Sequence, residues 1–341
     1  MTKSNFFIKL THWEFWTTGF VYIPVVAYFA WLALRMRSLF FFTAVNPNME
    51  AGGLFGASKY KQLCYLPYDL KPKTVFIPQK SRINIILETL NDEHIAFPCI
   101  AKPDKAERGI GVALLKNEAD LTQYLQQNKT DFVVQTYIDY PFEAGVFVYK
   151  MPKSTHFTIS SIVLKEFLSV TGDGRTDLKQ LILQNFRAKL VWERLAQTWH
   201  DRLQDVPRQG EQIFLEPIGN HNRGTKFING NHLISTELET IFTDICAHLP
   251  DFHYGRLDLR APNLATFLRG EHLKIMEVNG VNAEPAHIYD PATSPLTGWK
   301  TLLEHWTIIY KISKNNIHNG LKTMTLHEGL QHYRNWQAAV Q

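Results

Sequence analysis

Three oxygen-bearing side chains interrupt two apolar segments in the carboxyl-terminal half of the chain. Asp258 lies in YGRLDLRA (254–261), and Glu277 and Asn279 lie two residues apart in LKIMEVNG (273–280). Both segments are typical of buried strands, so Glu277 and Asn279 project from the same face of one strand. A neighbouring strand can bring Asp258 beside them. Carboxylate and amide oxygens at this spacing suit Mg²⁺, which takes one or two carboxylates together with phosphate oxygens.

The alternative interpretation of these residues is a solvated face of an edge strand. Asp258 and Glu277 interrupt otherwise apolar runs. An unpaired carboxylate buried among apolar residues costs several kcal/mol, so we favour a metal site.

Lys102 is a candidate ligand for phosphate groups. It stands at the end of the strand-like PCIAKP (98–103), ahead of the loop AERGIGV (106–112). Backbone NH groups at Gly109 and Gly111 can approach phosphates closely, because glycine has no side chain. A Gly-x-Gly pair alone is more often a hairpin turn.

The segment VVQTYIDYPFEAGVFVY offers groups that suit a nucleotide. Glu143 can bind ribose hydroxyl groups. By itself, neither the Glu143 carboxylate nor the backbone of the residues before it is specific evidence for a nucleotide site. Four consecutive residues can present backbone donors and acceptors to the edge of an adenine: Gln135, Thr136, Tyr137 and Ile138.

Strands and helices alternate along the rest of the chain. The tight turn Gly172-Asp173-Gly174 favours antiparallel pairing, and therefore an α+β protein rather than one doubly wound sheet. Apolar and β-branched runs predict further strands over 38–45, 73–77, 98–103, 131–138, 144–151 and 157–170. Helical periodicity predicts helices over 81–95, 118–128, 176–204, 236–249, 296–313 and 321–339.

The amino terminus carries an uncharged apolar run over residues 15–34. As one helix this run would reach about 30 Å, enough to cross the hydrocarbon core of a membrane. Tryptophans lie near its two ends, where aromatic rings favour the membrane interface, and Arg35 and Arg37 follow directly. These cations would keep the downstream chain in the cytoplasm. Pro24 also allows a re-entrant or interfacial helix pair, and the alternative is a buried aromatic-rich helix of a soluble core.

The overall composition excludes several classes of protein. The chain has 341 residues, 45% of them hydrophobic and 20% charged, as in a globular protein. A formal net charge of +4 without a basic run argues against a nucleic-acid partner. Three widely spaced cysteines indicate neither a disulfide framework nor a zinc site, which favours a reducing compartment.

The order of four blocks resembles that of the ATP-grasp superfamily: FPCIAKPDKAERGIGV, VVQTYIDYPFEAGVFV, YGRLDLR and KIMEVN. Enzymes of this superfamily are carboxylate–amine or carboxylate–thiol ligases that proceed through an acylphosphate. The resemblance extends over residues 50–290, and the Arg-x-Asp … Glu-x-Asn pair is its most specific part. It implies an ATP-grasp fold, in which two α+β lobes clamp ATP.

This resemblance implies a role for each matching residue around the metal. ATP and Mg²⁺ would be the cofactors, with Mn²⁺ as an alternative metal. Asp258, Glu277 and Asn279 would hold two Mg²⁺ ions. Arg256 would face the acylphosphate and the tetrahedral intermediate.

The resemblance also implies where the nucleotide lies. Lys102 would bind the nucleotide phosphates, and Gly109 and Gly111 would belong to the loop that covers them. The adenine would lie against Gln135–Ile138, and Glu143 would bind the ribose.

A second phosphate-binding lysine is implied by GGLFGASKYKQLCYLPYDLKPKTVFI. Lys59 is the best match to it, and Lys61 is the alternative. ATP-grasp ligases usually carry a sizeable α/β domain ahead of this lysine, whereas only residues 38–50 remain for it here. Part of the pocket that usually binds the first substrate is therefore missing. If a membrane-apposed segment replaces the missing pocket wall, the substrate is lipid-linked or amphiphilic.

Two further stretches, KEFLSVTGDGRTDLKQLI and IGNHNRGTKFING, resemble cyanophycin synthetases and related peptide-forming ligases. D-alanine–D-alanine ligases share the metal motif but match these stretches less well. Lys165 and Arg175 would lie near the polyphosphate or the acceptor. His221, Asn222 and Arg223 would touch the acceptor, unless they form only a solvated loop.

We therefore expect an ATP- and Mg²⁺-dependent, ADP-forming ligase that joins a small-molecule carboxylate to an amine. It would act at the cytoplasmic face of a membrane, with the cytoplasm as the alternative location. An ATP-grasp phosphotransferase and a non-catalytic ATP-binding membrane partner are the alternative functions. The expected parts are a hydrophobic membrane-associating segment (1–37), a reduced pre-ATP-grasp region (38–80), the ATP-grasp catalytic domain (81–295) and carboxyl-terminal helices (296–341).

Overall fold

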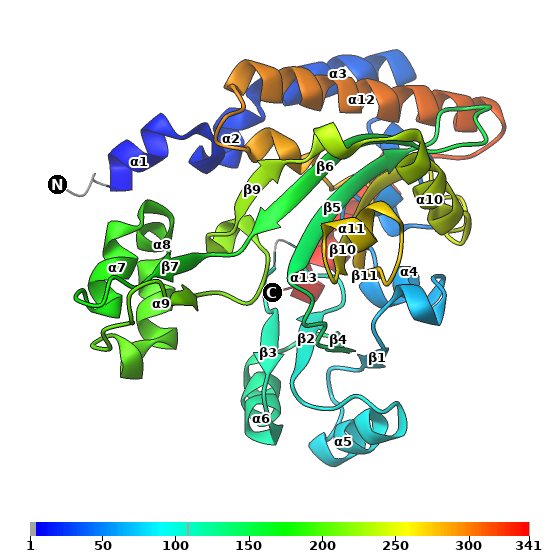
Figure 1. Cartoon of the computed structure of the whole chain (residues 1–341). Helices are drawn as coiled ribbons and strands as arrows, with labels where there is room; N and C mark the ends of the chain where they lie inside the picture. The colour runs from blue at the N-terminus through cyan, green and yellow to red at the C-terminus, as the bar shows by residue number, and fades with distance from the viewer. Residues whose placement is uncertain (1–4, 108, 341) are drawn as a thin grey trace.

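The computed structural model describes residues 5–107 and 109–340 (Figure 1), so residues 1–4 and 341 of the expected terminal parts lie outside the described residues. The strands are β1 (Thr74–Ile77), β2 (Cys99–Pro103), β3 (Ala113–Leu115), β4 (Phe132–Thr136), β5 (Phe142–Tyr149), β6 (Thr158–Glu166), β7 (Ser169–Thr171), β8 (Gln212–Phe214), β9 (Lys226–Asn229), β10 (Tyr254–Ala261) and β11 (Lys274–Asn279). The α-helices are α1 (Asn5–Thr11), α2 (Thr18–Val21), α3 (Ile23–Met36), α4 (Lys59–Cys64), α5 (Ile83–Asp92), α6 (Glu118–Gln127), α7 (Leu178–Gln184), α8 (Phe186–Leu190), α9 (Trp192–Thr198), α10 (Thr236–Ala247), α11 (Leu264–Leu268), α12 (Pro295–His318) and α13 (Leu326–Val340).

The strands form two larger sheets and one small one. The four-stranded sheet has the order β1-β4-β2-β3, the five-stranded sheet has the order β11-β10-β5-β6-β9, and β7 pairs with β8. All the strand pairs in these sheets are antiparallel. The prediction of an α+β protein with antiparallel sheets is therefore confirmed.

Each larger sheet has its own hydrophobic core. In the four-stranded lobe, Ile86 and Leu90 of α5 and Leu121 of α6 pack against the sheet. The five-stranded sheet is covered on both faces. Val146 of β5 packs in the cluster that contains α10, whereas the adjacent Phe147 packs in the cluster that contains α3 and α12. This double burial explains why β5 is apolar without alternation.

The small sheet belongs to a separate packing unit with α7, α8 and α9 (Figure 1). The sequence predicted that Gly172-Asp173-Gly174 closes a tight hairpin, and this is wrong. β7 pairs with β8, and the three short helices lie between these two strands in the chain. Asp173 instead accepts hydrogen bonds from the backbone of Arg175 and Thr176, which turns the chain towards α7.

The apolar run over residues 15–34 does not form one helix. It is divided between a 3-10 turn (Trp13–Phe15), α2 and α3, and Pro24 lies in the first turn of α3. α3 packs along α12 through Leu32 and Ala33, as Figure 1 shows. Among the helices of the described residues, none is both long and apolar enough to cross a membrane.

The prediction of a strand over residues 38–45 is also wrong. Phe41–Ala44 form a 3-10 turn, and every residue from Phe40 to Val45 is buried. A strand would bury alternate residues against one core, whereas this turn distributes its side chains around the backbone. Phe41 stacks on Phe29 of α3, with 5.7 Å between the ring centroids.

The glycine-rich segment before α4 lies directly against the end of β11. The backbone NH groups of Val281 and Asn282 donate to the carbonyl oxygens of Gly52 and Gly53, at 3.2 and 2.9 Å. A Cβ on Gly280 would lie 2.7 Å from the Gly52 oxygen. This close approach anchors the segment that leads to Lys59 against the strand that carries Glu277.

We expect Gly280→Ala to destabilise the protein by about 1–3 kcal/mol, as overpacking of a close backbone contact does. Gly19→Ala is the matched control, because a Cβ there would meet nothing within 4 Å. Denaturant unfolding of both variants measures the difference. Equal free energies of unfolding would show that the glycine-rich segment moves away from the added methyl group without loss of stability.

Two buried histidines predict an acid-sensitive fold. Burial lowers the pKa of His287 to about 4, and a hydrogen bond of 2.7 Å joins its Nδ1 to Ser161 Oγ. Burial likewise lowers the pKa of His305 to about 3. An unfolded histidine has a pKa of about 6.5, so between pH 6.5 and 4 the unfolded chain binds protons that the folded chain does not. Stability therefore falls as the pH falls through this range.

For His287 alone, the free energy of unfolding is expected to fall by on the order of 2 kcal/mol on going from pH 7.5 to pH 5. Denaturant unfolding of His287→Asn at both pH values isolates this share, since the carboxylates remain the same. A variant with an unchanged pH slope would contradict the assignment.

Candidate functional site

A cavity of about 830 Å³ contains most of the residues singled out in the sequence. Its walls come from both larger sheets, from the amino-terminal helices α2 and α3, and from α12. Lys102 and Gln135 line it from the four-stranded lobe. Asp258 and Glu277 line it from the five-stranded sheet. The cavity therefore lies between the two lobes.

The pairing of β10 with β11 brings the most specific motif together. Arg256 is the register partner of Asn279, and Asp258 is the register partner of Glu277. The pairing predicted from the sequence for these two strands is therefore present. The four side chains all line the cavity.

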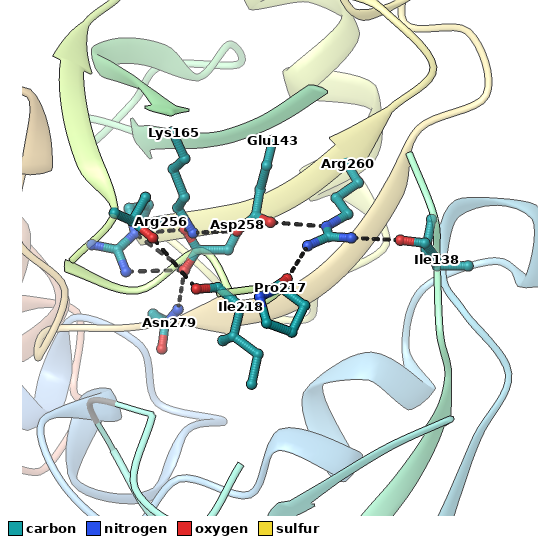
Figure 2. Close-up of polar contacts among 10 residues, drawn as sticks. Ile138, Glu143, Lys165, Pro217, Ile218, Arg256, Asp258, Arg260 and Asn279 are labelled. Atoms are coloured by element: carbon teal, nitrogen blue, oxygen red, sulfur yellow. Dashed lines mark hydrogen bonds and ion pairs between the residues drawn. The ribbon is translucent and has the colours of Figure 1, made fainter. Parts of the chain in front are cut away.

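Asp258 is the centre of a buried charge network (Figure 2). Its carboxylate accepts from Arg256 Nη2 at 2.9 Å and from Asn279 Nδ2 at 3.0 Å, and it lies 3.3 Å from Lys165 Nζ. Burial alone would raise the pKa of Asp258, but Arg256 and Lys165 outweigh burial and hold this pKa below its usual range. The carboxylate therefore stays charged.

The donor atoms at this point fit a hard cation. With Asn279 Nδ2 directed to Asp258, the amide oxygen of Asn279 is available, and Glu277 Oε1 lies 3.5 Å from Lys59 Nζ. Two carboxylates and one amide oxygen are the ligands that Mg²⁺ prefers. Asp258 would have to exchange one of its present partners to bind a cation. Within the described residues, no group of three or more histidines, cysteines or carboxylates could hold a metal ion. The role of Asp258, Glu277 and Asn279 as metal ligands stays a prediction.

Lys102 and Lys59 lie beside this group. Lys102 Nζ donates to Gln135 Oε1 at 3.2 Å and to the Met276 carbonyl oxygen at 2.9 Å. Burial lowers the pKa of Lys102 to about 8, and the ammonium of Lys59 acts in the same direction. Lys61, the alternative to Lys59, pairs with Glu50 at 3.8 Å and does not line the cavity. The structure thus favours Lys59 as the second lysine.

The glycine loop after β2 is held by the segment that contains Arg223. Gly109 and Gly111 have positive φ angles of 73° and 69°. Arg223 Nη2 donates to the carbonyl oxygens of Gly109 and Val112, at 3.3 and 2.8 Å. Gly109 lines the cavity, whereas a Cβ on Gly111 would lie 2.6 Å from Pro103 Cγ. Positive φ and close packing both explain the glycines at these positions.

The predicted adenine hinge lies at the end of β4. Gln135, Tyr137 and Ile138 line the cavity. The backbone NH of Thr136 donates to the Lys73 carbonyl oxygen at 3.0 Å, and the Ile138 carbonyl oxygen accepts from Arg260 Nη1 at 2.6 Å. The adenine contact stays a prediction.

Arg260 is a site residue that sequence reasoning missed. Its Nε donates to Glu143 Oε2 at 2.8 Å, and Lys165 Nζ lies 2.9 Å from the other oxygen of that carboxylate (Figure 2). Glu143 lines the cavity as expected, but both of its oxygens already have cationic partners. Its role as a ribose ligand stays a prediction. The missed signal was alternation, because Arg256, Asp258 and Arg260 share one face of β10.

The remaining candidate residues of the loops differ in whether they line the cavity. Lys165 and His221 line the cavity, whereas Arg175 is exposed and does not. Sequence reasoning also missed Glu14, whose Oε2 accepts from Arg187 Nη2 at 2.6 Å and lies 3.4 Å from His221 Nε2. Glu14 contributes to the cavity from the amino-terminal segment.

Residues 57–144 match a family model described as the tubulin-tyrosine ligase family. This family is part of the ATP-grasp-like superfamily, so the resemblance that the sequence predicts is confirmed at the level of the superfamily. The matched stretch contains Lys59, Lys102 and the glycine loop. No curated protein matches the sequence.

Several solved structures are similar to this chain. The VanG D-Ala:D-Ser ligase from Enterococcus faecalis matches 76% of this chain and 62% of its own chain, at 13% identity and a TM-score of 0.44. The D-alanine–D-alanine ligase from Bacillus anthracis complexed with ATP matches 76% of this chain and 67% of its own, at 14% identity and a TM-score of 0.42. A bifunctional glutathione synthetase from Pasteurella multocida matches 75% of this chain and 38% of its own, at 13% identity and a TM-score of 0.36. The present chain thus spans less than two thirds of the VanG ligase.

Proposed function

We propose that this chain is an ATP- and Mg²⁺-dependent ligase that joins a carboxylate to an amine through an acylphosphate. The observation that carries the proposal is the set of Arg256, Asp258, Glu277 and Asn279 on one strand pair, facing Lys102 across a cavity between two lobes. The match to a family of the ATP-grasp-like superfamily supports it. The ADP-forming chemistry and the substrates belong to the proposal.

The residues of the cavity have different tasks in the proposed reaction. Lys59 and Lys102 bind the nucleotide phosphates and neutralise charge that develops on the transferred group. Asp258, Glu277 and Asn279 would hold Mg²⁺, which would polarise the phosphoryl oxygens and neutralise their charge. Arg256 stabilises the oxyanion that forms when the amine attacks the acyl carbon. The Gly109–Gly111 loop excludes water from the acylphosphate.

A screen of carboxylate and amine pairs for release of ADP and phosphate tests this proposal. Hydroxylamine added in place of the amine would trap an acylphosphate as a hydroxamate. ATP turnover that needs both a carboxylate and an amine supports the ligase. Turnover with one substrate and no hydroxamate would favour the phosphotransferase, and binding of ATP without any turnover would favour the non-catalytic partner.

We also propose that the amino-terminal helices rest on a lipid surface. Their outward side is apolar, since Ile23, Val26 and Leu34 are 62, 59 and 78% exposed. The basic residues Arg35 and Arg37 lie at the end of the same helix, where they complement anionic headgroups. The arrangement suits an interfacial helix rather than a spanning one.

The double variant Ile23→Asp, Leu34→Asp is expected to reduce flotation with anionic phospholipid vesicles by at least about tenfold, because each buried aliphatic side chain contributes about 1.5–3 kcal/mol. The control is Tyr68→Asp, Ile85→Asp, which removes two exposed apolar side chains elsewhere. Wild-type protein that stays at the bottom of the gradient would overturn the membrane proposal. Equal loss in both double variants would do the same.

A further inference from the structure

The proposed nucleotide and metal roles leave one part of the cavity lining unused, the part formed by the amino-terminal helices and α12. These helices lie side by side in Figure 1. Val26 is both a wall of the cavity and part of the exposed side of α3, so this part of the cavity reaches the surface. This wall includes the side chains of Val21, Tyr22, Val26, Leu302, Trp306 and Ile309, together with His305 of α12.

Glu284 is the charged group at the inner limit of this part of the cavity. Its carboxylate accepts hydrogen bonds from the phenols of Tyr22 and Tyr289, the second at 2.8 Å. Burial, together with the negative charge of Glu284, raises the pKa of Tyr22, so this phenol remains a neutral donor. Within the described part of the chain, the carboxylate forms no ion pair with a lysine, arginine or histidine.

This situation differs from that of the other cavity carboxylates. Asp258 and Glu143 pair with Arg256, Arg260 and Lys165. The hydrogen-bond donors to the Glu284 carboxylate are neutral phenols, and the guanidinium of Arg256 acts on this carboxylate through its charge without an ion-pair contact. A partly buried carboxylate without a paired cation carries a charge that a cationic ligand can compensate. Glu284 is also beside the reaction centre, because Arg256 Nη1 donates to the Glu284 carbonyl oxygen at 3.2 Å.

We infer that this part of the cavity is the acceptor subsite, and that it takes a primary amine attached to an apolar chain. The ammonium lies on Glu284, and the chain extends between α3 and α12 towards the surface at Val26. The inference rests on the proposed function and names its acceptor. Glu284 takes one proton from the ammonium, and the nitrogen lone pair then forms the bond to the acyl carbon. The acyl–oxygen bond breaks, and phosphate leaves with that electron pair and the second N–H proton.

Binding of simple amines to the full chain tests the inference without any turnover. We expect n-octylamine to bind up to roughly 250-fold more tightly than n-butylamine, because it has four more CH₂ groups and each buried CH₂ adds about a factor of four. Octanoate, which has a similar chain and the opposite charge, is expected to bind at least about tenfold more weakly than octylamine. Titration calorimetry at pH 7.5, with and without a non-hydrolysable ATP analogue, measures all three ligands.

Two pairs of variants locate the binding. Glu284→Gln should weaken octylamine binding at least about tenfold, whereas the exposed control Glu271→Gln should not. Val26→Trp should narrow the cavity and bring octylamine close to butylamine, whereas Ala27→Trp, on the exposed side of the same helix, should not. Thermal unfolding of each variant controls for the fold.

The inference is overturned if octylamine binds no more tightly than butylamine or octanoate, or if Glu284→Gln keeps wild-type affinity. The ATP analogue separates the two levels of the argument. Binding of the analogue without preference for octylamine removes only the acceptor inference. Failure of the analogue to bind removes the ligase proposal itself.

Discussion

A chain in which glutamine replaces Glu277 is expected to lose two to four orders of magnitude of ATP turnover, as when metal-assisted charge neutralisation is removed from phosphoryl transfer. Glutamine preserves the volume of the side chain and one oxygen, but not the charge that holds Mg²⁺. Lys59, which lies 3.5 Å from Glu277, also loses its anionic partner.

The measurement is ADP release with the carboxylate and amine pair that the wild-type chain uses. Glu271→Gln is the control, because Glu271 is an exposed carboxylate that pairs with Arg269 at the surface. Circular dichroism and thermal unfolding confirm that both variants fold. Near-wild-type turnover by the Glu277 variant would show that the metal is held elsewhere.

The strands of the site were predictable because their signals are local. The predicted segment 254–261 coincides with β10, and 273–280 contains β11. Polar residues at every second position of an apolar strand must share a face, whatever the rest of the chain does. Glu277 and Asn279 could therefore be placed on one face of a strand, and Arg260 could have been placed with Asp258 by the same rule.

The amino-terminal segment was less predictable because its conformation depends on distant residues. Apolar length alone favours a membrane span over residues 15–34. In the structure Pro24 starts a new helix, and Leu32 and Ala33 pack against residues of α12 near the other end of the chain. The buried turn at Phe41 has the same origin, since its partners Phe29 and Trp306 come from two separate helices.

Glu284 shows the same limit at the site itself. Its phenol partner Tyr22 is 262 residues away in the sequence, within a run that looked purely apolar. No spacing rule links residues at that distance. Only the packing of α2 and α3 beside α12 reveals that the amino-terminal segment supplies a wall of the cavity.

Substitutions of Lys102 and Arg256 are expected to impair different steps, nucleotide binding and turnover respectively. Lys102→Met should weaken binding of a non-hydrolysable ATP analogue by roughly 10- to 100-fold, because a charge-assisted contact to phosphate is lost. Methionine keeps the buried volume, and replacing a buried charge by an apolar side chain of similar size is often neutral for stability. The effect should also appear in the wild-type chain as the pH rises above 8, since Lys102 has a pKa of about 8 and loses its charge there.

Arg256→Ala is expected to leave affinity for the analogue within about threefold and to lower turnover by roughly 10²- to 10³-fold, since the charge that it stabilises develops only during the reaction. Asp258 keeps Lys165 as a partner at 3.3 Å, so the strand pair should still fold. Arg269→Ala, which removes an exposed arginine, is the control. Titration calorimetry with the analogue, followed by ADP release, separates binding from turnover. If both variants lose affinity equally, Arg256 contacts the nucleotide in the ground state, and the proposed division between a phosphate-binding lysine and an oxyanion-stabilising arginine fails.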